Sequence, residues 1–428
     1  MKSHYLLFKH RRFLPIFLTQ FQGALTDNLI KNMLILTAAF EIYANAPGLS
    51  EMVIAVSGAL LMLPFFLFSS ISGQIADRFD KAIVTRFIKG FEVCLMLLAV
   101  YGFMNRSVTI LLIIVFLLGL HSTFFGPIKY SILPQHLEER ELLAGNAFIE
   151  GGTFIAILAG CILGNELPLT LKLDTISQGA VYVALLGACL SAGGFFISFF
   201  IPSAPSMQKD LKISFNIFRS TKEIIKYSQC NKKVFRAIMA ISWFWTIGMA
   251  IMTLLPNFVK DFLNAAPSVY TFFLIVFTVG IAIGSLLCEV IMREKIHTRY
   301  VPVGGLGMTI FIILLFYLSL EYNCPENIVT LWLFLLTPWN WIIVLDILAI
   351  SLFSGFYVVP LNTLVQQLSE KAHMSRVIAS NNIFNSVYMV AGTILFTICI
   401  NLGMSIPYFL LCLGISNFIF TTFIIRRP

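Results

Sequence analysis

The sequence predicts an all-α membrane protein whose twelve transmembrane helices form two six-helix halves. Hydrophobic residues make up 58% of the 428 residues and charged residues only 12%, which is about half the charged fraction of a soluble domain. Apolar runs of about 20 residues, the length that crosses a bilayer, recur from end to end. Lysine and arginine are also distributed unequally between alternate connections, as in polytopic membrane proteins.

Twelve apolar runs are long enough to cross a membrane. They are residues 13–40, 51–75, 82–103, 108–134, 142–165, 178–201, 233–259, 268–292, 300–320, 341–367, 377–402 and 406–425. Segment 328–338 (IVTLWLFLLTP) is apolar but too short to cross. Because Trp332 and Trp339 are of the type that gathers at membrane interfaces, we expect this segment to be interfacial.

The orientation follows from the basic residues. With the N-terminus in the cytosol, the inner side holds 24 of the 29 lysines and arginines, and the outer side holds only Arg106, Lys172 and Lys260. Basic residues favour the cytosolic side, so both termini are expected there. Attraction to anionic headgroups then accounts for the net charge of +8, and no nucleic-acid partner is needed.

The longest inner connection, residues 202–232, is expected to link an N-terminal half (1–201) to a C-terminal half (233–428). Apolar residues recur in it at helical spacing, opposite basic residues. This pattern fits either a basic amphipathic helix on the inner membrane surface or a solvated tether. The halves also echo each other, since FFGPIKYSILPQHL ending span 4 is similar to FSGFYVVPLNTLVQQL ending span 10. Such paired halves are typical of duplicated transporter folds.

A charged motif follows the second span. The stretch SGQIADRFDKAIVTR contains Gly73, Asp77, Arg78 and Lys81, and it resembles the signature loop of the major facilitator superfamily. Gly73 would allow close helix approach, while Asp77 and Arg78 would pair with neighbouring helix ends and latch the inner gate. The four residues are therefore gating candidates. Asp80 stands where the superfamily pattern usually has Gly.

Five stretches in chain order narrow this resemblance. They are TDNLIKN, ADRFDKA, GPIKYSILPQ, GNAFIEGGT and GFYVVPLN, and together they resemble the lysophospholipid transporter (LplT-type) family. The resemblance implies a flippase of the bacterial inner membrane that moves lysophospholipids, chiefly lysophosphatidylethanolamine, to the cytoplasmic leaflet by alternating access for reacylation.

The same resemblance bears on partners and specificity. Because this sequence contains no acyltransferase or acyl-carrier-protein synthetase domain, we expect that enzyme to be a separate chain. We expect the transporter itself to be a monomer among membrane lipids. Some family members carry an Arg in span 7, where this sequence reads GMAIMTLLP, a departure that bears on headgroup preference.

Ionisable residues inside the spans are candidates for function, because each costs about 2.5–3.5 kcal/mol at mid-membrane. Asp27 and Lys31, four residues apart, share a helix face and either pair with each other or line a central cavity. Lys129 and Glu150 are expected at matching depth on antiparallel spans 4 and 5, as an ion pair that a zwitterionic headgroup engages or breaks. The complete set of substrate-binding candidates is Asp27, Asn28, Lys31, Glu92, Lys129, Tyr130, Asn146, Glu150, Asn381 and Asn385.

Three further ionisable residues leave alternatives open. Glu92 either contacts the cavity or receives an Arg from the motif loop. His121 fits a buried, hydrogen-bonded histidine better than a proton relay, and Asp346 is expected to reach water near the outer face.

The alternative function in the same fold is a proton-coupled drug or solute exporter, with Asp27, Glu92 or Glu150 as the proton carrier. An enzyme is not expected, because no His-x4-Asp pair or comparable constellation lies near a membrane face. The sequence has no phosphate-binding P-loop, and its eight cysteines form no CxxC pair. No cofactor or metal is therefore expected.

Overall fold

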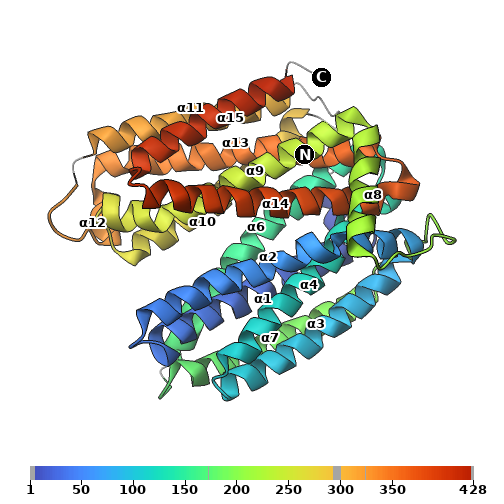
Figure 1. The fold of residues 1–428 in the computed structure, drawn as a ribbon, viewed down its shortest axis with the longest axis horizontal. Coiled ribbons are helices and arrows are strands. Elements are labelled where there is room, and N and C mark those ends of the chain that lie inside the picture. Colours follow the sequence, from blue (N-terminus) through green and yellow to red (C-terminus); the bar gives the residue numbers. More distant parts are fainter. Residues whose placement is uncertain (1–4, 172, 293–299, 323, 426–428) are drawn as a thin grey trace. The chain divides into compact units, whose positions relative to one another are not determined.

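The computed structural model describes residues 5–171, 173–292, 300–322 and 324–425 (Figure 1). Among these residues all long elements are helices, and each predicted span corresponds to one helix of 20 residues or more. Basic residues that were assigned to the inner side at 1–4, 293–299 and 426–427, and Lys172 on the outer side, lie outside the described residues.

The first six long helices follow their apolar runs closely. They are α1 (Leu14–Thr37), α2 (Pro47–Arg78), α3 (Lys81–Met104), α4 (Val108–Ser131), α6 (Leu142–Thr170) and α7 (Ile176–Ser198). Capping residues fix several of their starts. Ser107 and Thr175 accept hydrogen bonds from backbone N–H groups in the first turns of α4 and α7. The short α5 (Leu133–His136) leads from α4 towards α6.

The second six long helices complete the predicted set. They are α9 (Lys232–Asn257), α10 (Pro267–Met292), α11 (Tyr300–Glu321), α13 (Pro338–Leu368), α14 (Met374–Asn401) and α15 (Ile406–Ile425). Within the described ranges, nine helical segments are long and apolar enough to cross a membrane. Helices α1, α3 and α15 fall outside that set, and α1 and α3 carry the charged residues discussed below.

The chain divides into two compact units, which are described separately. Unit 1 comprises Met1–Gly145, Ile155–Asn231 and Gln366–Ser386, and unit 2 comprises Asn146–Phe154, Lys232–Val365 and Val387–Pro428. Each unit thus takes a short segment from the other half of the sequence. The linker residues up to Asn231 belong to unit 1.

Unit 1 has an apolar core between α1, α2, α3, α4 and α7. Leu29, Met33, Met96 and Leu118 have no exposed surface there. Helix α6 packs closely on α1, because a Cβ atom on Gly164 would lie only 2.6 Å from the carbonyl oxygen of Leu29. A small residue is needed at such a close helix crossing.

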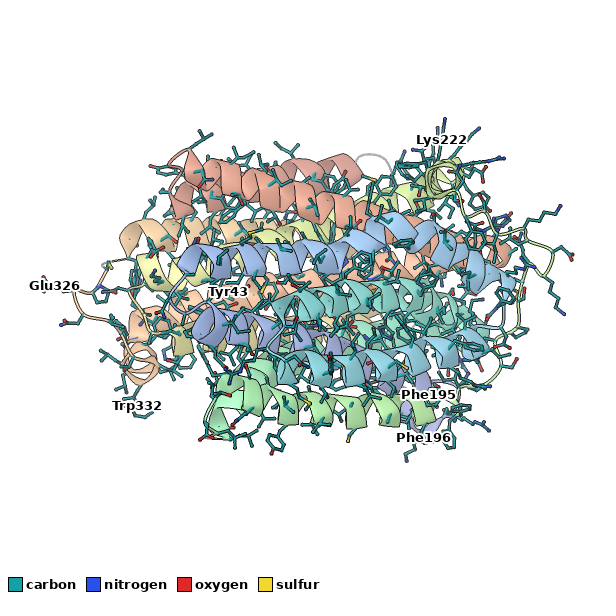
Figure 2. The ribbon with its side chains drawn as sticks, turned by 60° about the horizontal axis from the view of Figure 1, so that its bottom comes forward. Tyr43, Phe195, Phe196, Lys222, Glu326 and Trp332 are labelled. Carbon is teal, nitrogen blue, oxygen red and sulfur yellow. The ribbon has the colours of Figure 1, made fainter. Side chains whose placement is uncertain are left out.

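Besides α5, two short helices lie outside the twelve. Helix α12 (Leu331–Leu336) forms within the segment predicted to be interfacial, and Trp332 projects outward with 72% of its surface exposed (Figure 2). Helix α8 (Ile217–Cys230) forms in the predicted linker, with Ile224 buried and Lys222 pointing outward. The amphipathic helix of the linker is confirmed, while its position on the inner membrane surface stays a prediction.

Candidate functional site

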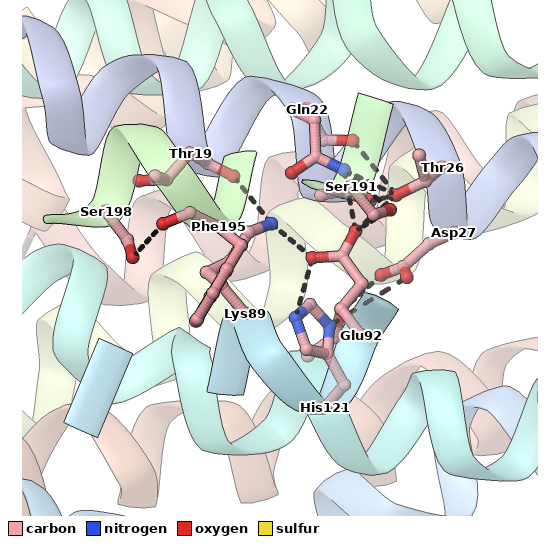
Figure 3. A network of polar contacts seen from close by, with 12 residues as sticks. Thr19, Gln22, Thr26, Asp27, Lys89, Glu92, His121, Ser191, Phe195 and Ser198 are labelled. Carbon is pink, nitrogen blue, oxygen red and sulfur yellow. Dashed lines mark hydrogen bonds and ion pairs between the residues drawn. The ribbon is translucent and has the colours of Figure 1, made fainter. Parts of the chain in front are cut away.

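A buried polar network joins α1, α3, α4 and α7 of unit 1 (Figure 3). Lys89 and Glu92, three residues apart on α3, form an ion pair in which neither side chain is exposed. Nζ of Lys89 also donates to the backbone carbonyl of Thr19 on α1, at 3.2 Å. A buried ion pair needs such additional hydrogen bonds, because both charges have lost their contact with water.

Glu92 also accepts hydrogen bonds from two further helices of this network. Its Oε1 atom accepts hydrogen bonds from Thr26 Oγ1 at 2.6 Å, Gln22 Nε2 at 2.7 Å and Ser191 Oγ at 3.2 Å. Glu92 therefore connects α3 to α1 and α7. The alternative in which it receives an Arg from the motif loop is wrong, since its cation is Lys89 of the same helix.

Asp27 faces α4 rather than Lys31. Ser122 donates a hydrogen bond to Oδ2 of Asp27, and Nδ1 of His121 lies 4.0 Å from Oδ1. The other ring nitrogen of His121, Nε2, lies 3.2 Å from Oε2 of Glu92. No ion pair joins Asp27 to Lys31 in the described part of the chain, so the self-pairing alternative is wrong. The physical reason is that the carboxylate faces α4, where Ser122 donates to one of its oxygens.

The amides of α1 bond back to their own helix. Asn28 donates to the backbone carbonyl of Ala24, and Asn32 donates to that of Asn28, both at 2.8 Å. Asn28 and Lys31 are half-buried. Their role in lining a substrate cavity stays a prediction.

The gating candidate Asp77 is held by the start of α14. Its Oδ1 accepts from the backbone N–H of Ser375 at 3.0 Å, and its Oδ2 accepts from Nε of Arg376 at 2.9 Å. Nη2 of Arg376 also donates to Gln208 at 2.6 Å. The expected contact of Asp77 with a neighbouring helix end is therefore present, and its cation is Arg376.

The other three gating candidates, Gly73, Arg78 and Lys81, each have different surroundings. A Cβ atom on Gly73 would lie 2.7 Å from Cβ of Ala379 and 2.9 Å from Cα of Arg376, so Gly73 does allow close approach of α14. The guanidinium of Arg78 lies over the ring of Phe79, at 5.3 Å from its centre, and pairs with no helix end in the described chain. Lys81 is buried.

Asp80, where the superfamily pattern usually has Gly, lies immediately before α3. Its carboxylate caps α3 by accepting from the backbone N–H groups of Ala82 at 2.8 Å and Ile83 at 3.3 Å, as Asp commonly does at helix starts. It also accepts from the hydroxyl of Ser203 at 2.5 Å.

The remaining substrate-binding candidates are divided between the units. In unit 1, the Lys129 ammonium lies 4.9 Å from the ring centre of Tyr130, and Gln366 donates to the backbone carbonyl of Tyr130 at 3.1 Å. In unit 2, Glu150 accepts from Asn362 at 2.7 Å, and Asn146 donates to Thr363 at 3.1 Å. Because Lys129 and Glu150 belong to different units, their ion pair stays a prediction.

Three further polar residues, Asn381, Asn385 and Asp346, lie on α13 and α14. Asn381 on α14 is buried and Asn385 is half-buried, and their roles stay predictions. Asp346 on α13 is 2% exposed, and neither of its carboxylate oxygens has a hydrogen-bond partner among the described residues. The expectation that Asp346 reaches water is therefore wrong, because the surrounding helices enclose it.

Sequence reasoning missed two cations. Lys89 counts among the 24 basic residues expected on the inner side, yet it is fully buried. Its spacing of three residues from Glu92 on one helix was the available signal. Arg376 was counted in the same way, and it meets Asp77 from 299 residues along the chain, a separation that no local pattern reveals. Within the described ranges no cluster of three metal-binding side chains occurs.

Helices long enough to cross a membrane, together with buried charges between them, define a polytopic membrane protein of the transporter class. The model of the Major Facilitator Superfamily matches residues 16–393, and the chain therefore belongs to this family.

The chain is similar to curated proteins named lysophospholipid transporter LplT. The relative from Photorhabdus laumondii is 25% identical over 404 residues, and that from Escherichia coli K12 is 24% identical over 406 residues. In both comparisons 91% of this chain and 89% of the relative are covered.

Solved transporters share the fold at low sequence identity. The fucose:proton symporter of Escherichia coli aligns with a TM-score of 0.71 and 10% identity, covering 97% of this chain and 98% of the symporter. A human organic anion transporter aligns with a TM-score of 0.72 and 13% identity, covering 96% of this chain and 99% of that protein.

Proposed function

We propose that this protein is a secondary transporter that moves lysophospholipids across the inner membrane of a bacterium by alternating access. The observation that carries the proposal is the similarity over 91% of the chain to relatives named as lysophospholipid transporters. The charges within the helices support it, since a lysophospholipid headgroup needs polar partners inside the membrane.

The finer parts of the proposal concern substrate, direction and setting. The substrate is lysophosphatidylethanolamine, which moves to the cytoplasmic leaflet and is reacylated there by a separate acyltransferase or acyl-carrier-protein synthetase. Both termini lie in the cytosol, and the transporter acts as a monomer. The excess of basic residues on the inner connections favours this orientation.

A zwitterionic headgroup presents one phosphate and one ammonium group. Lys129 would bind the phosphate, and Glu150 or Asp27 would bind the ammonium. Contacts within each unit support the two roles separately. Lys129 is oriented by the ring of Tyr130, and Glu150 is fixed by the amide of Asn362, so each charge is held by a neighbour before substrate arrives.

The contact between Asp77 and the start of α14 would act as the gate. Alternating access requires helices of the two sequence halves to separate and meet again in each cycle. Asp77 belongs to α2 of the first half and Arg376 to α14 of the second. Breaking their contact would accompany opening of the transporter at the end where Asp77 and Arg376 meet.

The experiment measures uptake of labelled lysophosphatidylethanolamine by proteoliposomes containing the protein, with protein-free vesicles as background. Lys129→Met and Glu150→Gln should each reduce the initial rate at least about tenfold, which corresponds to about 1.4 kcal/mol of lost interaction with the substrate. Lys260→Met, which removes an exposed lysine, is the matched control and should transport normally. Normal rates in both test variants would reject the headgroup assignment, and absent uptake by the wild type would reject the proposed function.

The proton-coupled exporter is the second candidate, and the buried network of His121 and two carboxylates favours it. Extrusion of drugs from vesicles without any lipid uptake would support that alternative. Lipid uptake without drug extrusion would exclude it.

A further inference from the structure

His121 lies between two carboxylates that come from different helices (Figure 3). Its Nε2 atom is 3.2 Å from Oε2 of Glu92, and its Nδ1 atom is 4.0 Å from Oδ1 of Asp27. A neutral imidazole carries one N–H and can donate to only one of these oxygens. The protonated ring carries two, so that an N–H faces each carboxylate.

The charges of the group do not balance unless one further positive charge is present. Lys89 and Glu92 cancel each other as an ion pair, and Asp27 adds one negative charge. The side chain of Asp27 is 9% exposed, and those of the other three residues are at most 1% exposed. An uncompensated charge is costly in such a buried place. One added proton brings the sum of the four groups to zero.

Among the described residues, no other charged side chain nearby supplies that balance. Lys31 lies on α1 and Arg86 on α3, but Arg86 stacks 5.2 Å from the centre of the Phe199 ring, and neither residue pairs with the network within the described chain. Lys129 is eight residues along α4 from His121, over Tyr130. Glu166 of α6 is exposed.

The two remaining neighbouring helices contribute no charge at this depth. Helix α7 has no charged residue, and its Tyr182 and Cys189 are exposed. Helix α2 has no titratable residue between Glu51 and Asp77. The balancing charge must therefore come from a proton or from a mobile cation. Nζ of Lys89 cannot supply it, because Lys89 already pairs with the Glu92 carboxylate.

We infer that Asp27, His121 and Glu92 form a binding site for one proton, and that binding of this proton is coupled to transport. The proton comes from hydronium in solution, where an O–H bond breaks and water is released, and an N–H bond forms at the unprotonated ring nitrogen of His121. Asp27 is the entry point, because it is the most exposed member of the group. The coupling half of this inference rests on the proposed function, whereas the binding site does not.

The site is tested first without lipid. Nitrogen-15 spectra of histidine-labelled protein in nanodiscs, recorded from about pH 5 to about pH 9, distinguish neutral from doubly protonated imidazole. Of the six histidine resonances, we expect the one that is missing in His121→Gln and persists in His136→Gln, the matched histidine control, to convert between these forms. A His121 resonance that stays a single neutral tautomer throughout would overturn the inference.

Coupling is tested in proteoliposomes with an imposed proton gradient. A difference of one pH unit across the membrane is a tenfold ratio of proton concentrations. If one proton is coupled to each lipid, the steady-state distribution of labelled lysophosphatidylethanolamine between leaflets should therefore shift by about tenfold per pH unit. In His121→Gln the distribution of the labelled lipid should not depend on the proton gradient. Wild-type lipid transport that also ignores the gradient would overturn the coupling while leaving the proposed function intact. Absent lipid transport would reject the proposed function, and the spectra would still decide the proton site.

Discussion

Arg376 donates a hydrogen bond from Nε to Oδ2 of Asp77 at 2.9 Å, although 299 residues separate them in the sequence. The Asp77 side chain has no exposed surface, and that of Arg376 is 17% exposed. The contact thus places a charged pair, largely without water, between the end of α2 and the start of α14. Removing one partner leaves the other charge poorly compensated, whereas removing both does not.

Breaking this pair is expected to destabilise the protein. Arg376→Gln should lower the free energy of unfolding by about 3 kcal/mol, because the buried Asp77 carboxylate loses its cation. The double variant Asp77→Asn/Arg376→Gln should lose less than the sum of the single losses. Thermal unfolding in detergent measures the effect. Arg140→Gln, whose pair with Glu138 is exposed, is the control and should change stability by less than about 1 kcal/mol. Strictly additive losses would contradict the pairing.

A methyl group at position 73 should force α2 and α14 apart. In Gly73→Ala the new Cβ would lie 2.9 Å from Cα of Arg376 and 3.0 Å from the carbonyl oxygen of Ser375, which are backbone atoms that cannot move independently. We expect a loss of about 1–3 kcal/mol. Gly58→Ala on the same helix meets nothing within 4 Å and should be neutral or stabilising by up to about 1 kcal/mol. Equal melting temperatures for the two variants would show that the close approach is absent.

The buried pair of α3 should show strong coupling. Lys89→Met leaves Glu92 without its cation, and Glu92→Gln leaves Lys89 without its anion, so each is expected to cost about 3–5 kcal/mol. The double variant should be more stable than either single variant, because no lone charge remains. Unfolding of all four proteins in one detergent completes the cycle. A double variant less stable than both singles would refute the prediction.

Asp80 should give α3 a pH-dependent cap. Partial burial raises the pKa of Asp80, but hydrogen bonds from Ser203 and three backbone N–H groups outweigh it, so the pKa lies below its ordinary value. Because the folded-state pKa is lowered, this stabilisation is complete above the unfolded value of about 3.9 and is lost as pH falls through the folded value.

Two substitutions separate the cap from the charge at position 80. Asp80→Ala removes the cap and should cost about 1 kcal/mol at neutral pH. Asp80→Asn keeps a capping side chain but removes the titration, so its loss of stability below about pH 4 should be smaller than that of the wild type. Stability profiles recorded against pH test both, and identical acid profiles for the Asp80→Asn variant and the wild type would contradict the assignment.

The helices were predictable because the bilayer imposes a simple rule on local sequence. A span needs about 20 apolar residues, and α11, for example, runs from Tyr300 to Glu321 where residues 300–320 were expected. The helix at Ile217–Cys230 was predictable for a similar reason, since amphipathic spacing is a local pattern. The sequence predicted that Asp77 contacts a neighbouring helix end, but it did not predict that the partner is Arg376.

The sequence by itself determined that this chain crosses a membrane many times, that its charges inside the spans are few, and which residues carry them. Only the tertiary structure decided how those charges pair. Asp27 meets Ser122 and His121 instead of Lys31, and Glu92 meets Lys89 together with groups from α1 and α7. The physical reason is that apolar length is a property of one helix, whereas the partner of a buried charge depends on how neighbouring helices are rotated and packed.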